Sequence, residues 1–247
     1  MAGILFSGDV FFDRLDDDGG STGLVHIGNA SQFQITETSN IKERTSKMRA
    51  SYGQVLDSVA IKSPAKIAIT LDDMNRANLA LVLLGKDAVA NQAAAPSQTK
   101  SFDMTTVDAG IYHEIGATRI TVTSVKIGTD AVAANAYVLD ADAGLIMFTE
   151  DAPTEGTLVV TYSVPAMAGY VISGGASPTV KGRLLLKGKN LADMSAGTVD
   201  VAEAVLTPKS GLDFLASDFA SAQLEGTLNT PSGAAAPYTV TVLAAAA

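Results

Sequence analysis

Side chains suited to acid–base or nucleophilic chemistry are few in this chain of 247 residues, which has two histidines and no cysteine. His26 and His113 each lie in a run typical of a β-strand, where a structural or surface histidine is commoner than a catalytic base. No GxSxG strand–turn–helix is present to expose a serine nucleophile. Without cysteine, disulfides and thiolate sites are excluded. We therefore predict no enzyme activity, no catalytic residue and no cofactor.

An acidic run, "DRLDDDGG" at residues 13–20, has some of the residue types of a calcium loop. Counting back from Gly19 gives Asp18, Asp16 and then Arg14, which breaks the required spacing, and the closing glutamate is missing. Asp and Gly clusters of this kind are typical of tight turns. We predict a solvated hairpin turn and no metal site.

The run "GRLLLKGK", Gly182 to Lys189, weakly resembles a phosphate-binding loop. Five residues separate its glycines where the motif has four, and Asn190 stands where a Ser or Thr would meet magnesium. The central "RLLL" favours a strand over a loop of free backbone N–H groups. We reject a nucleotide site here.

Charge is distributed unevenly, because the chain has a net charge of −9 while four of its 17 basic residues lie between Lys42 and Arg49. The overall acidity argues against DNA binding, which needs clustered Lys and Arg. Apolar residues among these charges indicate contact with a partner, and the acidic remainder of an identical copy is the natural complement. A solvated hairpin tip is the simpler alternative. The predicted contact residues are Lys42, Glu43, Arg44, Lys47, Met48, Arg49 and Tyr52.

Alternating polar and apolar residues predict β-strands with one wet face through most of the chain. In "ASQFQITE", Phe33 and Ile35 alternate with polar neighbours, and "SAQLEGTLN" repeats the pattern around Leu224. The wet residues of these two segments are Gln32, Gln34, Gln223, Glu225 and Thr227. One helix is predicted at 72–84, with Asp72 as its N-cap and Gly85 as its stop. Leu79, Val82 and Leu83 are its expected packing residues.

The length allows one large β-domain or a β-domain with a smaller module. Strand-like runs at 117–165 predict an inserted β module, within a main domain of residues 1–116 and 166–247. The stretch 88–101 is poor in large apolar residues and is predicted to be a linker. Apolar runs are far shorter than the roughly 20 residues of a membrane helix, so no membrane insertion is expected.

Three phrases, taken in order, resemble the major tail (tail tube) proteins of long flexible-tailed bacteriophages, the siphoviruses. They are "SGDVFFDRLDDDGGSTGLVHIGNASQF", "LDSVAIKSPAKIAITLDDMNRANLALVLLG" and "FLASDFASAQLEGTL". The resemblance covers most of residues 5–85 and 170–243. It implies a mainly β fold, a sandwich or barrel with one flanking α-helix, and places the inserted module on the outer surface.

The function implied by the resemblance is that of a viral structural protein. Six copies would form a ring, and rings would self-assemble by stacking into a hollow tube that carries the genome into the host during ejection. Expected partners are the chain itself, the tape-measure protein and tail-end proteins, while DNA would pass without sequence-specific binding. Expected locations are the virion tail and, during assembly, the host cytoplasm.

The resemblance also assigns surfaces to the residues above. A loop at about 38–53 would reach the neighbouring ring, and the five wet residues would be candidates for the lumen. The alternative from a different class is a β-sandwich module that binds a carbohydrate or receptor on a virion surface. The scattering of Tyr112, Tyr137, Phe148, Tyr162 and Tyr170 argues against a sugar-stacking platform. A hydrolase with an unrecognised site is the third possibility.

Overall fold

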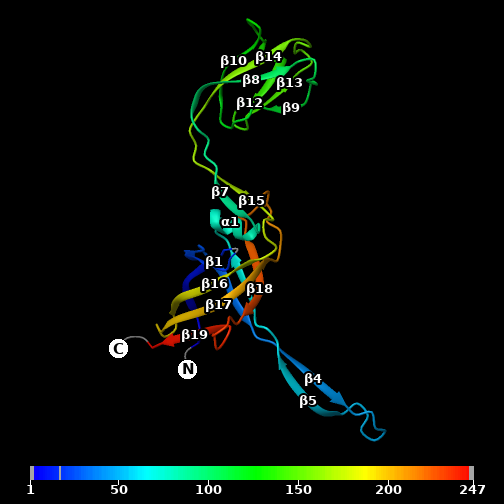
Figure 1. The fold of residues 1–247 in the computed structure, drawn as a ribbon, viewed down its shortest axis with the longest axis vertical. Coiled ribbons are helices and arrows are strands. Elements are labelled where there is room, and N and C mark those ends of the chain that lie inside the picture. Colours follow the sequence, from blue (N-terminus) through cyan, green and yellow to red (C-terminus); the bar gives the residue numbers. More distant parts are fainter. Residues whose placement is uncertain (1–2, 17, 245–247) are drawn as a thin grey trace. The chain divides into compact units, whose positions relative to one another are not determined.

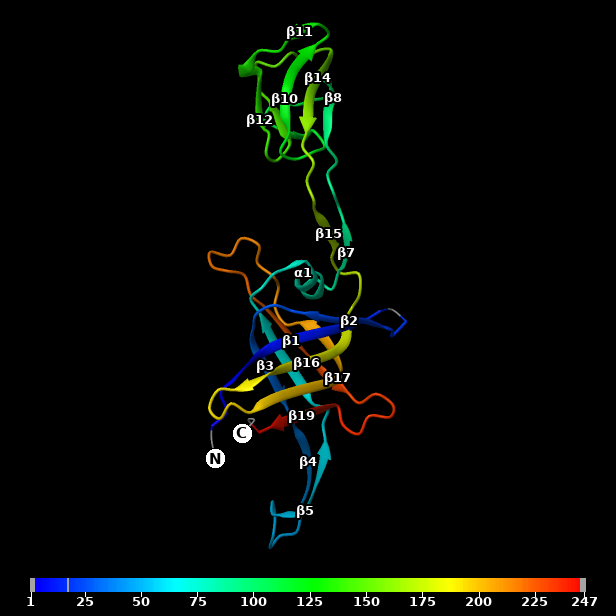
Figure 2. The same ribbon diagram turned by 90° about the vertical axis from the view of Figure 1, so that its left-hand side faces the viewer.

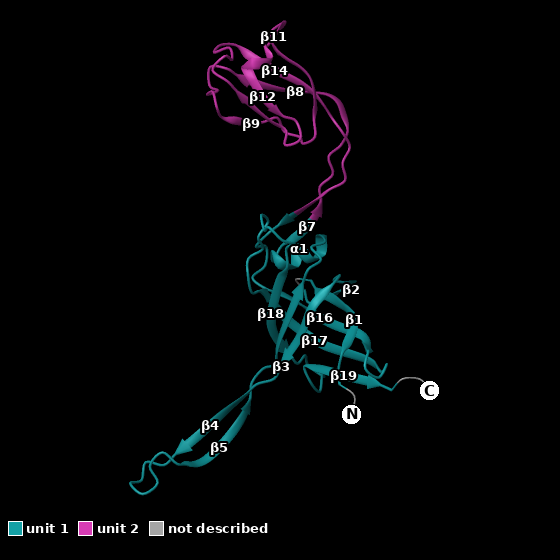
Figure 3. Cartoon of the chain, turned by 180° about the vertical axis from the view of Figure 1, so that it is seen from behind, with its two compact units in different colours: residues 1–87, 172–247 teal, residues 88–171 magenta. Residues whose placement is uncertain are grey.

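The computed structural model describes residues 3–16 and 18–244, which are mainly β with several sheets and a single α-helix. This confirms the predicted fold class, a sandwich- or barrel-like β fold with one helix. The chain divides into two compact units (Figure 3): unit 1 comprises residues 1–87 and 172–247, and unit 2 comprises residues 88–171. No helix of the described residues is long and apolar enough to cross a membrane.

Unit 1 is built on one antiparallel sheet in the order β2-β1-β16-β17-β18-β6-β3, with β19 paired to β17 (Figure 1). Its strands are β1 (Phe6–Leu15), β2 (Ser21–His26), β3 (Ala30–Thr36), β6 (Lys66–Leu71), β16 (Val180–Asn190), β17 (Ala196–Pro208), β18 (Ala222–Asn229) and β19 (Tyr238–Leu243). "GRLLLKGK" lies inside β16, as the strand reading predicted.

The sheet divides at β17, the longest strand. Its first half, Ala196–Val201, pairs with β19, and its second half, Glu203–Pro208, pairs with β18. The two parts of the sheet cross, as Figure 2 shows for β1, β16 and β17 against β3. Their inner faces enclose one apolar cluster in which Ile69, Leu71 and Val201 are fully buried. Complete burial contributes about 1.5–3 kcal/mol for each such side chain.

Helix α1, Arg76–Val82, is shorter than the predicted 72–84. Its N-cap is Asn75, whose side chain accepts a hydrogen bond from the Asn78 N–H at 3.0 Å. Asp72 was the wrong choice, because its carboxylate accepts a hydrogen bond from the Asn29 amide instead. At the other end Leu84, with φ of 50°, is in the left-handed region, one residue before the predicted stop at Gly85.

Two further strands, β4 (Ser39–Thr45) and β5 (Val55–Lys62), form a separate antiparallel hairpin within unit 1. The predicted loop at 38–53 is therefore largely a strand and a turn, and the element continues to Lys62. Lys42 and Arg44 are strand residues, a role that the sequence prediction missed because no apolar alternation marks β4.

Unit 2 consists of a four-stranded sheet, β11-β10-β14-β8, and a three-stranded sheet, β12-β13-β9. Their strands are β8 (Ala95–Asp103), β9 (Tyr112–Glu114), β10 (Thr121–Ile127), β11 (Asp130–Ala131), β12 (Tyr137–Asp140), β13 (Leu145–Phe148) and β14 (Thr157–Val164), with a 3-10 turn at Ala134–Ala136. Ile146, Phe148 and Leu158 are among the fully buried residues of its own core.

The second unit extends beyond the predicted 117–165, because β8 pairs with β14 and β9 pairs with β13. Much of the supposed linker at 88–101 is strand β8. The linker prediction was wrong because β8 is an edge strand in which only Phe102 is buried, so its sequence contains few large apolar residues. Strands β7 (Lys86–Val89) and β15 (Tyr170–Ser173) pair where the chain passes from one unit to the other.

Candidate functional site: a polar sheet face and a basic hairpin

One face of the strands β3, β6, β18 and the second half of β17 is polar. We call it the polar face. Register places Gln32 beside Thr70 and Thr70 beside Gln223, and the next row runs from Gln34 through Ala68 to Glu225. The third row, Thr36, Lys66 and Thr227, completes it. All five predicted wet residues, Gln32, Gln34, Gln223, Glu225 and Thr227, therefore share a single face although 191 residues separate Gln32 from Gln223.

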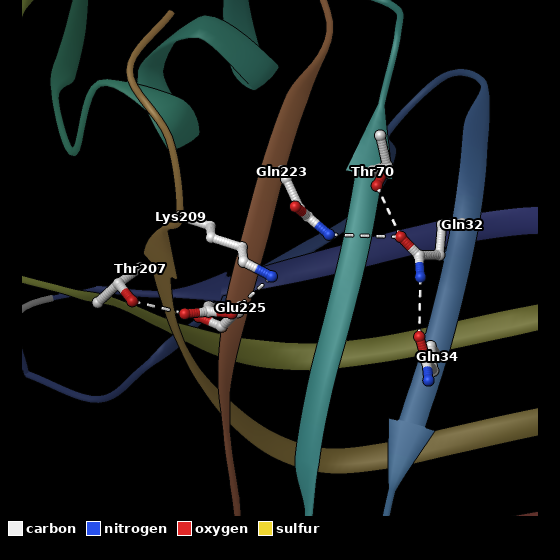
Figure 4. Close-up of polar contacts among 7 residues, drawn as sticks. All are labelled: Gln32, Gln34, Thr70, Thr207, Lys209, Gln223 and Glu225. Carbon is white, nitrogen blue, oxygen red and sulfur yellow. Dashed lines mark hydrogen bonds and ion pairs between the residues drawn. The ribbon is translucent and has the colours of Figure 1, made fainter.

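Side-chain hydrogen bonds join the strands of the polar face (Figure 4). The Gln32 Oε1 accepts from the Thr70 hydroxyl at 3.0 Å and from the Gln223 amide at 3.4 Å. The Gln32 amide in turn donates to Gln34 Oε1 at 2.8 Å. These bonds hold the amides in fixed positions along the surface, so the face is organised as well as wet.

The polar face carries little net charge. Lys209 Nζ lies 3.5 Å from Glu225 Oε2, an exposed ion pair worth at most about 1 kcal/mol. Beyond the third row, where Asn229 stands opposite Glu203, the Asn229 amide donates to Glu203 Oε1 at 2.7 Å. Two lysines, Lys66 and Lys209, are thus matched by two glutamates among neutral amides and hydroxyls. Such a face is hydrated without concentrating positive charge, so phosphate groups gain little by staying there.

The β4–β5 hairpin carries the opposite charge to the rest of the chain. Between Ser39 and Lys62 five basic and two acidic residues give +3, which leaves −12 on the remainder. Lys42 stands opposite Val59, and Glu43 stands opposite Ser58. Arg44 is paired with Asp57 in the ladder. The basic residues are thus spaced along one element instead of forming a compact phosphate site.

The tip of the hairpin is tightly hydrogen-bonded. Ser46 is buried, and its hydroxyl lies 2.7 Å from the Ser51 hydroxyl. The Ser46 hydroxyl also accepts a hydrogen bond from the Met48 N–H at 3.2 Å. Lys47 Nζ lies 5.5 Å from the centre of the Tyr52 ring, a cation–π distance. The side chains of Met48 and Tyr52 are nevertheless 63% and 70% exposed, so the tip presents charge and apolar surface together.

Apolar side chains on the hairpin strands are exposed as well. Ile41 and Val59 are each 58% exposed, and no residue of β4 or β5 is buried. A two-stranded hairpin with no core is marginally stable in water by itself. Val59 and Ile61 share one face of the hairpin with their partners Lys42 and Asn40, and Ile41 lies on the other face. Exposed apolar side chains among polar and charged neighbours make the hairpin a candidate interaction site.

Residues 4–236 of the chain match a family described as "Protein of unknown function UCP028589". The chain belongs to this family. The matched range covers all of unit 2 and most of unit 1, so the UCP028589 pattern spans the polar face, the hairpin and unit 2, and it ends before β19. A search of curated proteins found no match.

In this UCP028589 chain the three predicted helix residues lie at unequal depths. Val82 is buried in the main core, whereas Leu79 and Leu83 are half-buried. Beside the helix end, Val82 and Leu83 share a concavity with the segment 208–212. Leu84 in the left-handed region permits a bond from the Gly85 N–H to the Ala80 carbonyl at 2.8 Å, which ends the helix beside this concavity.

The residues first considered for chemistry have structural partners. His26 Nδ1 accepts from the Gly28 N–H at 3.1 Å, and His113 lies against the rings of Phe102 and Phe148. In the acidic turn, Asp16 Oδ1 accepts the N–H groups of Asp18 and Gly20. Within residues 3–16 and 18–244, no group of three His, Asp or Glu is placed to hold a metal ion.

Thr70, Thr207 and Lys209 belong to the polar face but were not among the lumen candidates predicted from the sequence. A signal was present for Thr70, since Ile67, Ile69 and Leu71 alternate with Lys66 and Thr70 in β6. For Lys209 there was none, because it lies beyond the end of β17 and joins the face through its N–H bond to the Gln223 carbonyl.

Proposed function

We propose that the chain is a structural virion protein whose copies form hexameric rings that stack into the hollow tail tube of a siphovirus-like bacteriophage. The observation that carries this proposal is the polar face. Five separately predicted wet residues converge on it, and amide and hydroxyl side chains dominate it. In the tube this face lines the lumen.

The sheet provides a route to ring closure. β3 is the last strand of the sheet order in unit 1, so one of its edges is unpaired within the sheet. Unpaired strand edges invite pairing with another chain, and closure into a barrel removes them. Repeated around a ring, the polar faces form a continuous inner wall.

The hairpin provides the contact between rings. Its net charge of +3 is opposite in sign to the remaining −12 of a neighbouring copy. Lys42, Arg44, Lys47 and Arg49 meet acidic surface there, and Met48, Tyr52 and the apolar strand residues become covered. DNA then passes a nearly neutral wall without base-specific contacts. A tape-measure protein occupies the lumen during assembly, tail-end proteins close the tube, and unit 2 lies on its outside.

Electron microscopy of the purified chain tests the proposal. Negative-stain images at several salt concentrations are expected to show rings or hollow filaments. The double charge reversal R44E/K47E is expected to abolish stacking, whereas K100E/K126E, the same charge change on exposed residues of unit 2, is expected to leave it intact. Monodisperse single copies at every salt concentration would contradict the proposal.

The second candidate is a carbohydrate- or receptor-binding module on a virion surface. Unit 2 favours it by having its own closed core. Against it, Phe148 and Tyr162 are buried in that core, and the exposed Tyr112 and Tyr170 belong to different sheets. Binding of the full chain to a glycan array, with no rings in solution, would favour this alternative.

A further inference from the structure

The loop between β17 and β18, residues 209–221, exposes apolar side chains that its own unit does not cover. Phe214, Leu215 and Phe219 are 72%, 94% and 96% exposed. Two aspartates order the backbone around them: Asp213 Oδ1 accepts from the Leu215 N–H at 2.9 Å, and Asp218 Oδ1 accepts from the Phe219 N–H at 2.8 Å.

The root of this β17–β18 loop is anchored. Leu212 packs against the main core, and the Lys209 N–H donates to the Gln223 carbonyl at 2.8 Å. The loop is therefore held at its base while its apolar tip faces outward. Exposed aromatic clusters on an ordered support are typical of contact sites.

An apolar groove lies around the start of β17. It has a volume of about 520 Å³. Its lining includes Ile4, Phe6, Phe33, Ile35, Val240 and Val242. Val240 and Val242 are 59% and 65% exposed, so the groove is open along β19.

Glycines make room for the groove wall. Gly8, Gly188 and Gly197 are paired in one row across β1, β16 and β17. A Cβ added at Gly197 would lie 2.3 Å from the Phe6 ring. The absence of a side chain at Gly197 therefore lets the Phe6 ring lie close against β17 at the groove wall.

The groove and the loop tip match in size and chemistry. A cavity of about 150 Å³ holds one benzene ring. A groove of about 520 Å³ thus suits roughly three apolar groups, and the loop presents two phenylalanines and one leucine. The charged residue of the groove is Asp193, and those next to the anchors of the loop are Asp213 and Asp218, so like charges would face each other. The attraction between groove and loop must therefore come from apolar burial.

A single copy does not join its own loop to its own groove. The loop follows Pro208 at the end of β17, and the groove lies at the beginning of this 13-residue strand. At roughly 3.3 Å per residue the two sites are up to about 40 Å apart along the strand. Figure 2 shows the orange loop next to α1, and β19 on the far side of β1, β16 and β17 from α1.

We propose that the β17–β18 loop of one copy docks in the groove of a second copy, with Phe214, Leu215 and Phe219 as its anchors. Because the two surfaces differ, the contact is head-to-tail and repeats from copy to copy. This inference rests on the proposed function and adds a second, apolar contact to the charged contact of the hairpin.

The expected strength of the contact fits a role in an array. An aromatic side chain buries about 150–250 Å², so the three anchors together bury on the order of 500 Å². That is less than the roughly 800 Å² per partner of a standard stable interface. The loop contact alone is therefore too small to hold two copies together. It forms when other contacts between the same copies support it.

Site-directed cross-linking tests the contact, because the chain has no native cysteine. A size-tagged S217C variant, which leaves the anchors intact, is mixed with untagged V242C under assembly conditions and oxidised with copper phenanthroline. The matched control is T241C, the exposed neighbour on β19 that does not line the groove. We expect at least fivefold more heterodimer with V242C than with T241C, and at least a fivefold loss when F214S/F219S is added to S217C.

Equal yields with V242C and T241C, or a yield unaffected by F214S/F219S, would overturn the inference. The inference would also be overturned if V242C formed a disulfide with S58C of the hairpin and none with S217C. Electron microscopy of the same samples separates the two proposals. Tubes without the loop cross-link leave the proposed function standing and refute the loop contact, and samples with neither tubes nor cross-links refute both.

Discussion

Strands β14 and β5 are both eight residues long, yet their side chains have opposite fates. In β14 every second residue is buried: Leu158, Val160, Tyr162 and Val164. In β5 no residue is buried, although it contains Val55, Leu56, Val59 and Ile61. Strand-forming residues thus appear in both places, and the difference is whether a second layer lies within the same chain.

The comparison extends to the units that hold these strands. Unit 2 closes two sheets around its own core. Unit 1 has a core too, but it also exposes apolar side chains on the hairpin, the β17–β18 loop and the groove. Unit 2 exposes some apolar side chains as well, among them Ile111 and Val138, but under the proposed function the surfaces that other copies cover belong to unit 1.

Two leucines give the largest expected difference. L158A in β14 should lower the free energy of unfolding by about 2–5 kcal/mol, because the side chain is fully buried and its removal leaves a cavity. L56A in β5, whose side chain is 47% exposed, should change it by less than about 0.5 kcal/mol. Urea unfolding of the unassembled chain measures both. Similar losses for the two variants would remove the contrast between the strands.

Polar substitution on the hairpin should separate assembly from folding. I41S/V59S should leave the stability of single copies within about 0.5 kcal/mol, because both side chains are already exposed. It should abolish stacking, since both would be covered between rings. Light scattering and electron microscopy report on stacking, and V138S in unit 2 is the control. The two side chains lie on opposite faces of the hairpin, so normal tubes from I41S/V59S would show that neither is needed for the contact between rings.

The helix cap tests a local effect within unit 1. N75A should cost about 0.5–2 kcal/mol because it removes the acceptor of the Asn78 N–H. D72A should cost less, since its exposed carboxylate bonds only to the Asn29 side chain and caps nothing. Thermal unfolding compares the two. A larger loss for D72A would restore the cap predicted from the sequence.

The smallest effect concerns acid stability, and each unit contains one example. Hydrogen bonds from Thr105 lower the pKa of Asp103 in unit 2, and bonds from Ser195 lower the pKa of Asp193 in unit 1. A carboxyl whose folded pKa is lowered stabilises the fold above its ordinary pKa of 3.8. That stabilisation is lost as the pH falls from 3.8 through the folded value.

In D103N and D193N the free energy of unfolding should therefore fall less steeply with acid than in the unchanged protein. Unfolding midpoints between pH 5 and pH 2 measure this loss. An unchanged slope for both variants would show that these carboxylates do not contribute.

Strand patterns were the most reliable part of the prediction. Alternation in β3, β6 and β18 correctly separated Phe33, Ile69 and Leu224 from their wet neighbours. Errors arose where local preference and tertiary context disagree. Asp72 is as good an N-cap type as Asn75, and β8 is polar because it lies at a sheet edge.

Local patterns along the chain are enough to show which side of each alternating strand is wet, that the chain is mainly β, and that positive charge concentrates near Lys42–Arg49. A period of two residues is local, so it can be read along a single strand. The folded chain was needed to show that Gln32 and Gln223 meet on one face, and that β5 and the loop at 209–221 lack apolar cover in their own unit. Register between strands far apart in the chain and the presence of a second layer are properties of packing, and no single segment encodes them.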